Sequence, residues 1–330
     1  MENASGIIIP VASGKGGVGK SVLTANLAIS LAEAGYSTIA IDLDLGGSNL
    51  HSYLGLSNDF AGIGDYVRAR TASLEDLLIP TGTTNLRIIP GDVRTPMMAN
   101  FHHAQKIKLI NDIKKLEAHY ILLDLGAGSS FNTLDMFGMS SRSLLITTPE
   151  YPAIMNMQMF LKNFIFRRIE GLVKSRSILL NLVHHLFALP HTEVVSVERI
   201  CREIETRDRD IAQKIRTLCA TYRPRIIYNM GQHYEDVNVA QKIDKSLYQM
   251  LSMEIDHFGF VFSDSEVTSS TRGKTPLLRY HRDSVVAQNI IEIADRIIRL
   301  WPKKLSASSE RLHQNAQKNY EQWFHGDSFQ

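Results

Sequence analysis

The chain has 330 residues, of which 44% are hydrophobic and 21% are charged, so it can bury one large core. Its formal net charge of +2 is too small to indicate a nucleic-acid partner by itself, and no apolar run reaches the roughly 18 residues needed to cross a bilayer. The first residues do not resemble a secretion signal, so we expect a cytoplasmic protein in which Cys201 and Cys219 stay reduced.

Short apolar runs alternate with helical patterns along most of the chain, which predicts the α/β class with a doubly wound, mainly parallel sheet. Strands are expected at residues 6–13, 37–44, 86–90, 120–125, 143–148, 225–229 and 258–262. Several of them are continuous apolar runs, as strands buried on both faces are. Helices are expected at residues 21–34, 104–117 and 284–300, where apolar residues recur at helical spacing.

The first expected strand leads into a glycine-rich segment that matches the phosphate-loop pattern Gly-x-x-x-x-Gly-Lys-Ser. Its residues are Gly14, Lys15, Gly16, Gly17, Val18, Gly19, Lys20 and Ser21, followed by Val22. Glycines let backbone amides turn toward phosphate oxygens, and the start of the following helix adds its positive dipole end. We expect Lys20 to contact the terminal phosphates of a nucleotide and the Ser21 hydroxyl to coordinate magnesium.

Two later strands end in acidic residues. Asp42 and Asp44 stand at the end of the second expected strand, and Asp124 ends the apolar run 120–125 just before a glycine-rich turn. An apolar strand that ends in an acid is the Walker B pattern, in which the carboxylate holds magnesium, usually through water. Either acidic strand end is commonplace alone, but their order behind the phosphate loop argues against coincidence.

Together these segments resemble the MinD/ParA superfamily of deviant P-loop ATPases, whose phosphate loop carries an additional early lysine. The resemblance implies that the chain binds ATP and Mg²⁺ and that Lys15 reaches the ATP of a second subunit in a homodimer. Such a lysine would act like an arginine finger supplied in trans. It also implies that Asp44 orients the attacking water. The catalytic residues are then Lys15, Lys20 and Asp44, and the metal ligands are Ser21, Asp44 and Asp124.

Later segments resemble the MinD and FlhG branch of this family. Residues 147–150 read Thr-Thr-Pro-Glu, although Asn156 stands where relatives carry aspartate. Residues 225–230 resemble the strand whose final asparagine contacts adenine, which implies that Asn229 binds the nucleotide. The residue that stacks on the base stays open. Iron–sulfur relatives need cysteine ligands near the dimer axis, and the positions of Cys201 and Cys219 do not fit that arrangement.

More residues lie between the expected strands near 148 and 225 than one crossover helix requires. We expect helices at 162–180 and 197–221 with a break near Leu189-Pro190, and we interpret the mixed charges of this stretch as a solvated face rather than a partner surface. The predicted organisation is a P-loop ATPase domain at 1–305 with a helical insertion at about 163–222, followed by a C-terminal tail at 306–330.

The tail has an apolar face if it is helical, formed by Leu312, Ala316, Tyr320, Trp323 and Phe324. This face would bind the inner surface of the cell membrane peripherally, as the family's tails do, or would dock on the protein itself or on a partner. A DNA contact is less favoured. Its candidates are scattered basic residues, Arg167, Arg168, Lys174, Arg176, Arg272, Lys274, Arg279 and Arg282, which we interpret as solubilising charge.

The resemblance implies a slow ATPase that dimerises on ATP binding and is stimulated by a protein activator. By this resemblance it controls the position or number of a cell-envelope structure such as a flagellum or septum. Two alternatives stay open: a ParA-type ATPase that partitions DNA or cargo, and a scaffold that binds nucleotide without hydrolysing it.

Overall fold

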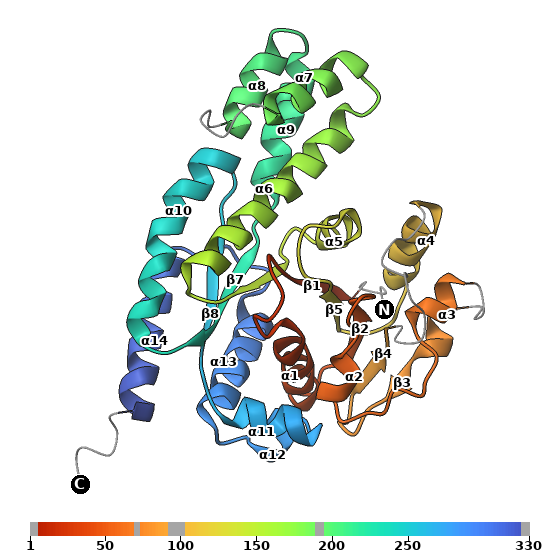
Figure 1. The fold of residues 1–330 in the computed structure, drawn as a ribbon, viewed down its shortest axis with the longest axis vertical. Helices are drawn as coiled ribbons and strands as arrows, with labels where there is room; N and C mark the ends of the chain where they lie inside the picture. The colour runs from red at the N-terminus through yellow and green to blue at the C-terminus, as the bar shows by residue number, and fades with distance from the viewer. Residues whose placement is uncertain (1–5, 69–72, 92–102, 189–194, 325–330) are drawn as a thin grey trace.

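The computed structural model describes residues 6–68, 73–91, 103–188 and 195–324. At its centre lies an eight-stranded sheet with the order β3-β4-β2-β5-β1-β6-β7-β8 (Figure 1). All neighbouring strands are parallel except β3 and β4. The strands are β1 (Ile7–Ser13), β2 (Thr38–Leu43), β3 (Ile79–Pro80), β4 (Leu86–Ile89), β5 (Tyr120–Leu125), β6 (Leu144–Thr147), β7 (Arg225–Gly231) and β8 (Asp256–Phe262). The prediction of a doubly wound, mainly parallel α/β sheet is confirmed.

Helices cover both faces of the sheet. One face packs on α1 (Lys20–Glu33), α2 (Leu50–Tyr53), α12 (Leu277–Tyr280) and α13 (Val285–Leu300), and α11 (Glu266–Gly273) lies beside α12. The other face packs on α3 (Ile63–Val67), α4 (His103–Ile113), α5 (Phe131–Phe137), α6 (Tyr151–Val173), α10 (Asn238–Leu251) and α14 (Ser308–Phe324). The short helices η1 (Glu75–Leu77) and η2 (Tyr234–Val237) complete the connections. Strands buried from both sides explain their continuous apolar sequences.

The expected helices between β6 and β7 differ from those observed. Helix α6 starts at Tyr151 and passes without interruption through residue 163, so no element boundary falls at the predicted start of the insertion. The expected helix 162–180 is wrong, because α6 ends at Val173 and α7 (Ser177–Phe187) begins after a short turn. The break expected near Leu189-Pro190 lies outside the described residues.

The expected single helix 197–221 is also wrong, because this segment forms two helices. Helix α8 (Val197–Glu205) ends before α9 (Arg209–Thr221), and the Asp208 carboxylate accepts a hydrogen bond of 2.9 Å from the Ile211 backbone amide. Asp208 therefore caps α9 rather than continuing one charged helical face. The end of α6 and helices α7, α8 and α9 project from the sheet as a helical region (Figure 1).

The predicted amphipathic tail is helix α14, and its apolar face packs on the protein itself. Leu312 and Ala316 are buried, and Tyr320 contacts the rings of His233 and Phe262. Trp323 and Phe324, at the end of the helix, are 37% and 47% exposed. No helix in the described ranges is long and apolar enough to cross a membrane.

Candidate functional site

The glycine-rich loop connects the carboxyl end of β1 to the first turn of α1, where the strand order of the sheet reverses. Gly17 and Gly19 have φ angles of 80° and 81°, a conformation that favours glycine. Gly14 packs against α6 so closely that an added Cβ would lie 2.4 Å from the Asn156 carbonyl oxygen. Gly16 and Gly17 are exposed, and added Cβ atoms there would meet nothing within 4 Å. The start of the loop is therefore packed tightly against α6, whereas its exposed middle part has space for a ligand.

Lys20 brings the acidic strand ends to the loop. Its ammonium donates a hydrogen bond of 2.7 Å to Asp124 Oδ1 and one of 3.3 Å to Ser21 Oγ, and it lies 3.7 Å from Asp44 Oδ2. Lys20 is only 6% exposed and Asp124 is fully buried. A buried ammonium needs such partners, because an isolated charge in this environment is strongly unfavourable. The three residues singled out from separate motifs therefore lie in one cluster.

Asp124 has one oxygen left for a further ligand. Its Oδ1 accepts from Lys20 and from Thr24 Oγ1 at 3.3 Å, whereas the buried Oδ2 has no hydrogen-bond partner among the described residues. Together with the Ser21 hydroxyl it offers the oxygen ligands that magnesium prefers. No group of three or more His, Cys, Asp and Glu side chains in the described ranges forms a metal site by itself. The cluster thus fits magnesium bound partly through phosphate and water.

Asp42 is fully buried and holds the turn that carries Asp44. It accepts hydrogen bonds from the Asp44 amide at 3.0 Å, from Ser48 Oγ at 2.7 Å and from the Leu50 amide at 3.1 Å. Burial first, and then the nearby charge of Asp124, raise the pKa of Asp42 to about 7. Asp42 is therefore an anchor for the turn rather than a group directed at a ligand.

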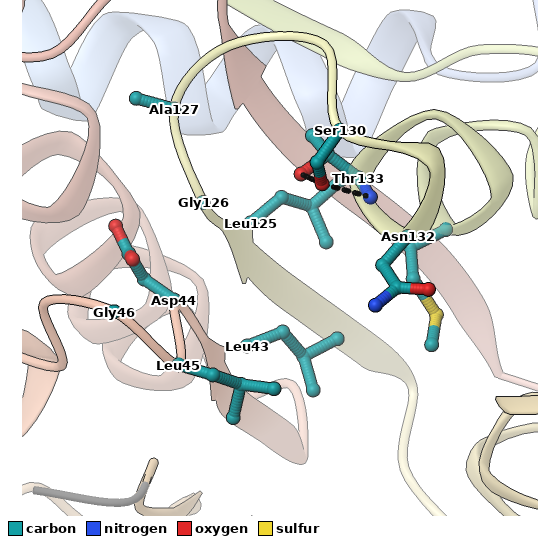
Figure 2. Close-up of a pocket in the computed structure, with 11 residues that line it drawn as sticks. Leu43, Asp44, Leu45, Gly46, Leu125, Gly126, Ala127, Ser130, Asn132 and Thr133 are labelled. Atoms are coloured by element: carbon teal, nitrogen blue, oxygen red, sulfur yellow. Dashed lines mark hydrogen bonds between the residues drawn. The ribbon is translucent and has the colours of Figure 1, made fainter. Parts of the chain in front are cut away.

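Asp44 borders a cavity of about 240 Å³ between the ends of β2 and β5 and the start of α5. Figure 2 shows its carboxylate on one side of this cavity and Ser130, Asn132 and Thr133 on the other. Ser130 Oγ accepts from the Thr133 amide at 3.2 Å and so caps α5. Ser130, Asn132 and Thr133 were not singled out from the sequence, because hydroxyl and amide side chains behind a glycine-rich turn are common in any α/β protein.

Lys15 lies in the loop with its side chain half-buried. Its carbonyl accepts a hydrogen bond of 2.9 Å from Ser13 Oγ, whereas its ammonium makes no hydrogen bond or ion pair within the described part of the chain. Val18 is buried beneath the loop, and Val22 is half-buried in the first turn of α1. Lys15 is thus a loop cation with no carboxylate partner there.

Asn229, near the end of β7, is hydrogen-bonded to the phosphate loop. Its Nδ2 donates a hydrogen bond of 2.8 Å to the Val18 carbonyl, and a Cβ on Gly19 would lie 2.3 Å from the same nitrogen. The side chain is 6% exposed. An adenine contact of Asn229 stays a prediction, while the bond to Val18 gives this residue a structural role that the sequence did not suggest.

A glycine-rich loop follows the first strand at the point where strand order reverses, and acidic residues end β5 beside it and β2 beyond β5. This arrangement defines the class of phosphate-loop nucleotide-binding proteins. Residues 9–277 match the family of CobQ/CobB/MinD/ParA nucleotide binding domains, and the chain belongs to this family.

Similar curated proteins include septum site-determining proteins MinD. The protein of Thermotoga maritima is 36% identical over 153 residues, which are 45% of this chain and 55% of that protein. The protein of Helicobacter pylori is 29% identical over 172 residues, or 52% of this chain and 60% of that protein. The similarity thus spans little more than half the length of these curated relatives.

Solved structures of related proteins share the fold. MinD of Pyrococcus horikoshii, solved in complex with Mg-ADP, has a TM-score of 0.62 and 22% identity over 89% of this chain and 97% of its own. MinD in the MinC:MinD complex of Aquifex aeolicus has a TM-score of 0.58 at 22% identity, covering 91% and 97%. A ParA family ATPase of Chlorobium tepidum has a TM-score of 0.57 at 17% identity, covering 88% and 98%.

Proposed function

We propose that the chain is a magnesium-dependent ATPase of the MinD/FlhG type. The observation that carries this proposal is the position of the Lys20 ammonium between Asp124 and Asp44 at the phosphate loop. When a nucleotide binds, its phosphates offer Lys20 a new anionic partner, and the released carboxylates become available to magnesium. Because Lys20 would exchange its carboxylate partners for phosphate, nucleotide binding is coupled to metal binding.

Each residue then has a defined role. The amides of residues 14–21 surround the phosphates and Lys20 neutralises the terminal ones. Ser21 and Asp124 would hold magnesium, which would supply positive charge against the phosphate oxygens. Asp44 borders the cavity of Figure 2 and is the group that orients the attacking water. Asp42 fixes the backbone of Asp44 through its hydrogen bonds and does not contact the substrate.

The active form is a homodimer in which Lys15 contacts the ATP of the second subunit. Two facing phosphate loops bring about eight negative charges to one interface, which two magnesium ions balance only in part. A further cation from each subunit is required, and the Lys15 ammonium has no carboxylate partner among the described residues. Its position in the open loop supports this role.

The proposed biological role is ATP-dependent control of the position or number of a cell-envelope structure, with a protein activator. The MinD relatives are named for septum site determination, and one structure is a complex with MinC, which supports a role of this kind. Attachment to the inner face of the membrane would involve the exposed Trp323 and Phe324, or release of α14 from the protein.

The test is the rate of phosphate release from Mg-ATP, measured with the protein alone, with vesicles of anionic phospholipid and with double-stranded DNA. The proposal predicts slow turnover that vesicles increase and DNA does not. Stimulation by DNA alone would favour the partitioning role, which the ParA-family structural neighbour also supports. Binding of ATP without any turnover in the three conditions would favour the scaffold.

A further inference from the structure

A second cavity, of about 630 Å³, lies where the helical region meets the body of the protein. Its walls come from α4, α5, α6, α7 and α9, and none of its lining residues belongs to the cavity beside Asp44. The volume lies within the range of about 300–1,000 Å³ that small-molecule sites occupy. The nucleotide site does not use this space.

The two carboxylates of this cavity already have cationic partners. Asp135 accepts from Arg167 Nε at 3.1 Å and from Arg167 Nη2 at 3.2 Å, and it also pairs with the buried Lys106. Glu170 pairs with Arg167 at 3.1 Å and with His184 at 2.9 Å. The acidic groups are therefore saturated and do not attract a cationic ligand.

Two further cations line the cavity without a carboxylate partner in the described ranges, namely Arg168 and Lys174. The Arg168 guanidinium lies 5.5 Å from the centre of the Tyr222 ring, and its buried Nε has no hydrogen-bond acceptor among the described residues. Because both side chains line the cavity and neither charge is balanced by a carboxylate there, an anion is the ligand that their charges favour.

The remaining wall is apolar. It is formed by Ile107, Ile110, Leu172, Leu180 and Leu218. A small inorganic anion would leave this surface in water, whereas an organic body would cover it. We propose that the cavity binds an amphiphilic organic anion, with its carboxylate, sulfonate or phosphate at Arg168 and Lys174 and its apolar part against these side chains.

Such a ligand would act on the nucleotide site through α5. This short helix contributes Asp135 to the second cavity and Asn132, Thr133 and Met136 to the cavity beside Asp44. Because Arg167 and Lys106 line the same cavity, the charge of an anion held by Arg168 and Lys174 weakens their pairs with Asp135 and so changes the constraint on α5. This coupling rests on the proposed ATPase function, but binding of the anion does not.

Binding is tested with 8-anilinonaphthalene-1-sulfonate, a fluorescent amphiphilic anion, titrated into the full chain without nucleotide. Arg168→Gln and Lys174→Gln should each weaken binding about tenfold, because each removes a charged contact. Lys174 is exposed, so its substitution tests the site without disturbing the core. Lys214→Gln, on the exposed side of α9, is the matched control and should leave the affinity unchanged.

Displacement then defines the ligand class. Decanoate should displace the dye, whereas inorganic phosphate at the same concentration and Mg-ADP should not. Wild-type affinity in both Arg168→Gln and Lys174→Gln, or displacement by Mg-ADP, would overturn the site. Equal displacement by phosphate would overturn the amphiphilic class. Decanoate should also change ATP turnover in the wild type more than in Lys174→Gln, and an equal response in both would refute the coupling.

Discussion

Lys20 Nζ donates a hydrogen bond of 2.7 Å to Asp124 Oδ1 and so joins the first turn of α1 to the end of β5 across 104 positions of the chain. Both groups are almost completely removed from water, at 6% and 0% exposure. In this state the Lys20 ammonium and the Asp124 carboxylate neutralise one another. Under the proposed function, phosphate that draws Lys20 away would leave Asp124 buried without a cation, and magnesium would compensate for that loss.

Lys20→Ala should abolish ATP binding, because the main cation for the phosphates is lost. The same change leaves the Asp124 carboxylate buried without its ion-pair partner, so the free energy of unfolding should fall by about 3–5 kcal/mol. Calorimetry with Mg-ATP measures the first effect and urea unfolding the second. ATP affinity at the wild-type level in the folded variant would show that the phosphate-loop assignment is wrong.

Gly19→Ala should destabilise the protein by about 1–3 kcal/mol, because Gly19 has a φ of 81° and a Cβ there would lie 2.3 Å from Asn229 Nδ2. Gly16→Ala is the matched control in the same loop, since its Cβ would meet nothing within 4 Å. Thermal unfolding of both variants compares them directly. An equal effect of the two substitutions would contradict the tight contact between Gly19 and Asn229.

The sequence was sufficient to predict every strand except β3, and the phosphate loop, because their signals are local. The β5 run is almost entirely apolar because helices cover both faces of the sheet there. The loop contains glycines because Gly17 and Gly19 have positive φ angles. Strand β3 was missed because two residues, one of them Pro80, form no apolar pattern. Fold class and the identity of Lys20, Ser21, Asp44 and Asp124 as candidates thus needed no tertiary information.

Other features depend on contacts that no local pattern contains. The role of Asp42 arises because Ser48 and Leu50 fold back onto it, and Asn229 reaches the Val18 carbonyl 211 positions away. The tail illustrates the limit most clearly, because an apolar face on a helix predicts burial but does not specify against what. In α14 Leu312 and Ala316 pack on the protein itself.

The pKa of Asp42 predicts a dependence of stability on pH. Burial and Asp124 raise this pKa from 3.8 to about 7, so between these values the folded protein holds a proton that the unfolded chain has lost. Its contribution to the free energy of unfolding is therefore complete below about pH 4 and decreases as the pH rises through about 7.

Asp42→Asn removes this titration. We subtract the free energy of unfolding of Asp42→Asn from that of the wild type at each pH. This difference should be smaller at about pH 8 than at about pH 5, by on the order of 1–3 kcal/mol. Urea unfolding of both proteins at both pH values measures it, and effects of all other groups are shared. A difference that grows with pH would mean that Asp42 is an ordinary ionised carboxylate.

Asp44→Ala should retain ATP binding and lower phosphate release by about a hundredfold or more, because the water would lose its orienting group. Asp59→Ala, an exposed acid later in the same connection, is the control and should keep full turnover. Nucleotide retained by the protein and phosphate released are measured in one filter assay. Normal release by Asp44→Ala would show that another residue orients the attacking water.

The proposed ATP-bound dimer requires Lys15, whose ammonium has no anionic partner within the described part of the subunit. The decisive measurement is the mass, by size-exclusion chromatography with light scattering in Mg-ATP, of the Lys15→Ala, Asp44→Ala protein. Asp44→Ala alone and Asp44→Ala with Lys114→Ala, which removes an exposed lysine elsewhere, are the references. We predict dimers for both references and an ATP-bound monomer for Lys15→Ala, Asp44→Ala. A dimer in that protein would contradict the role of Lys15 in trans.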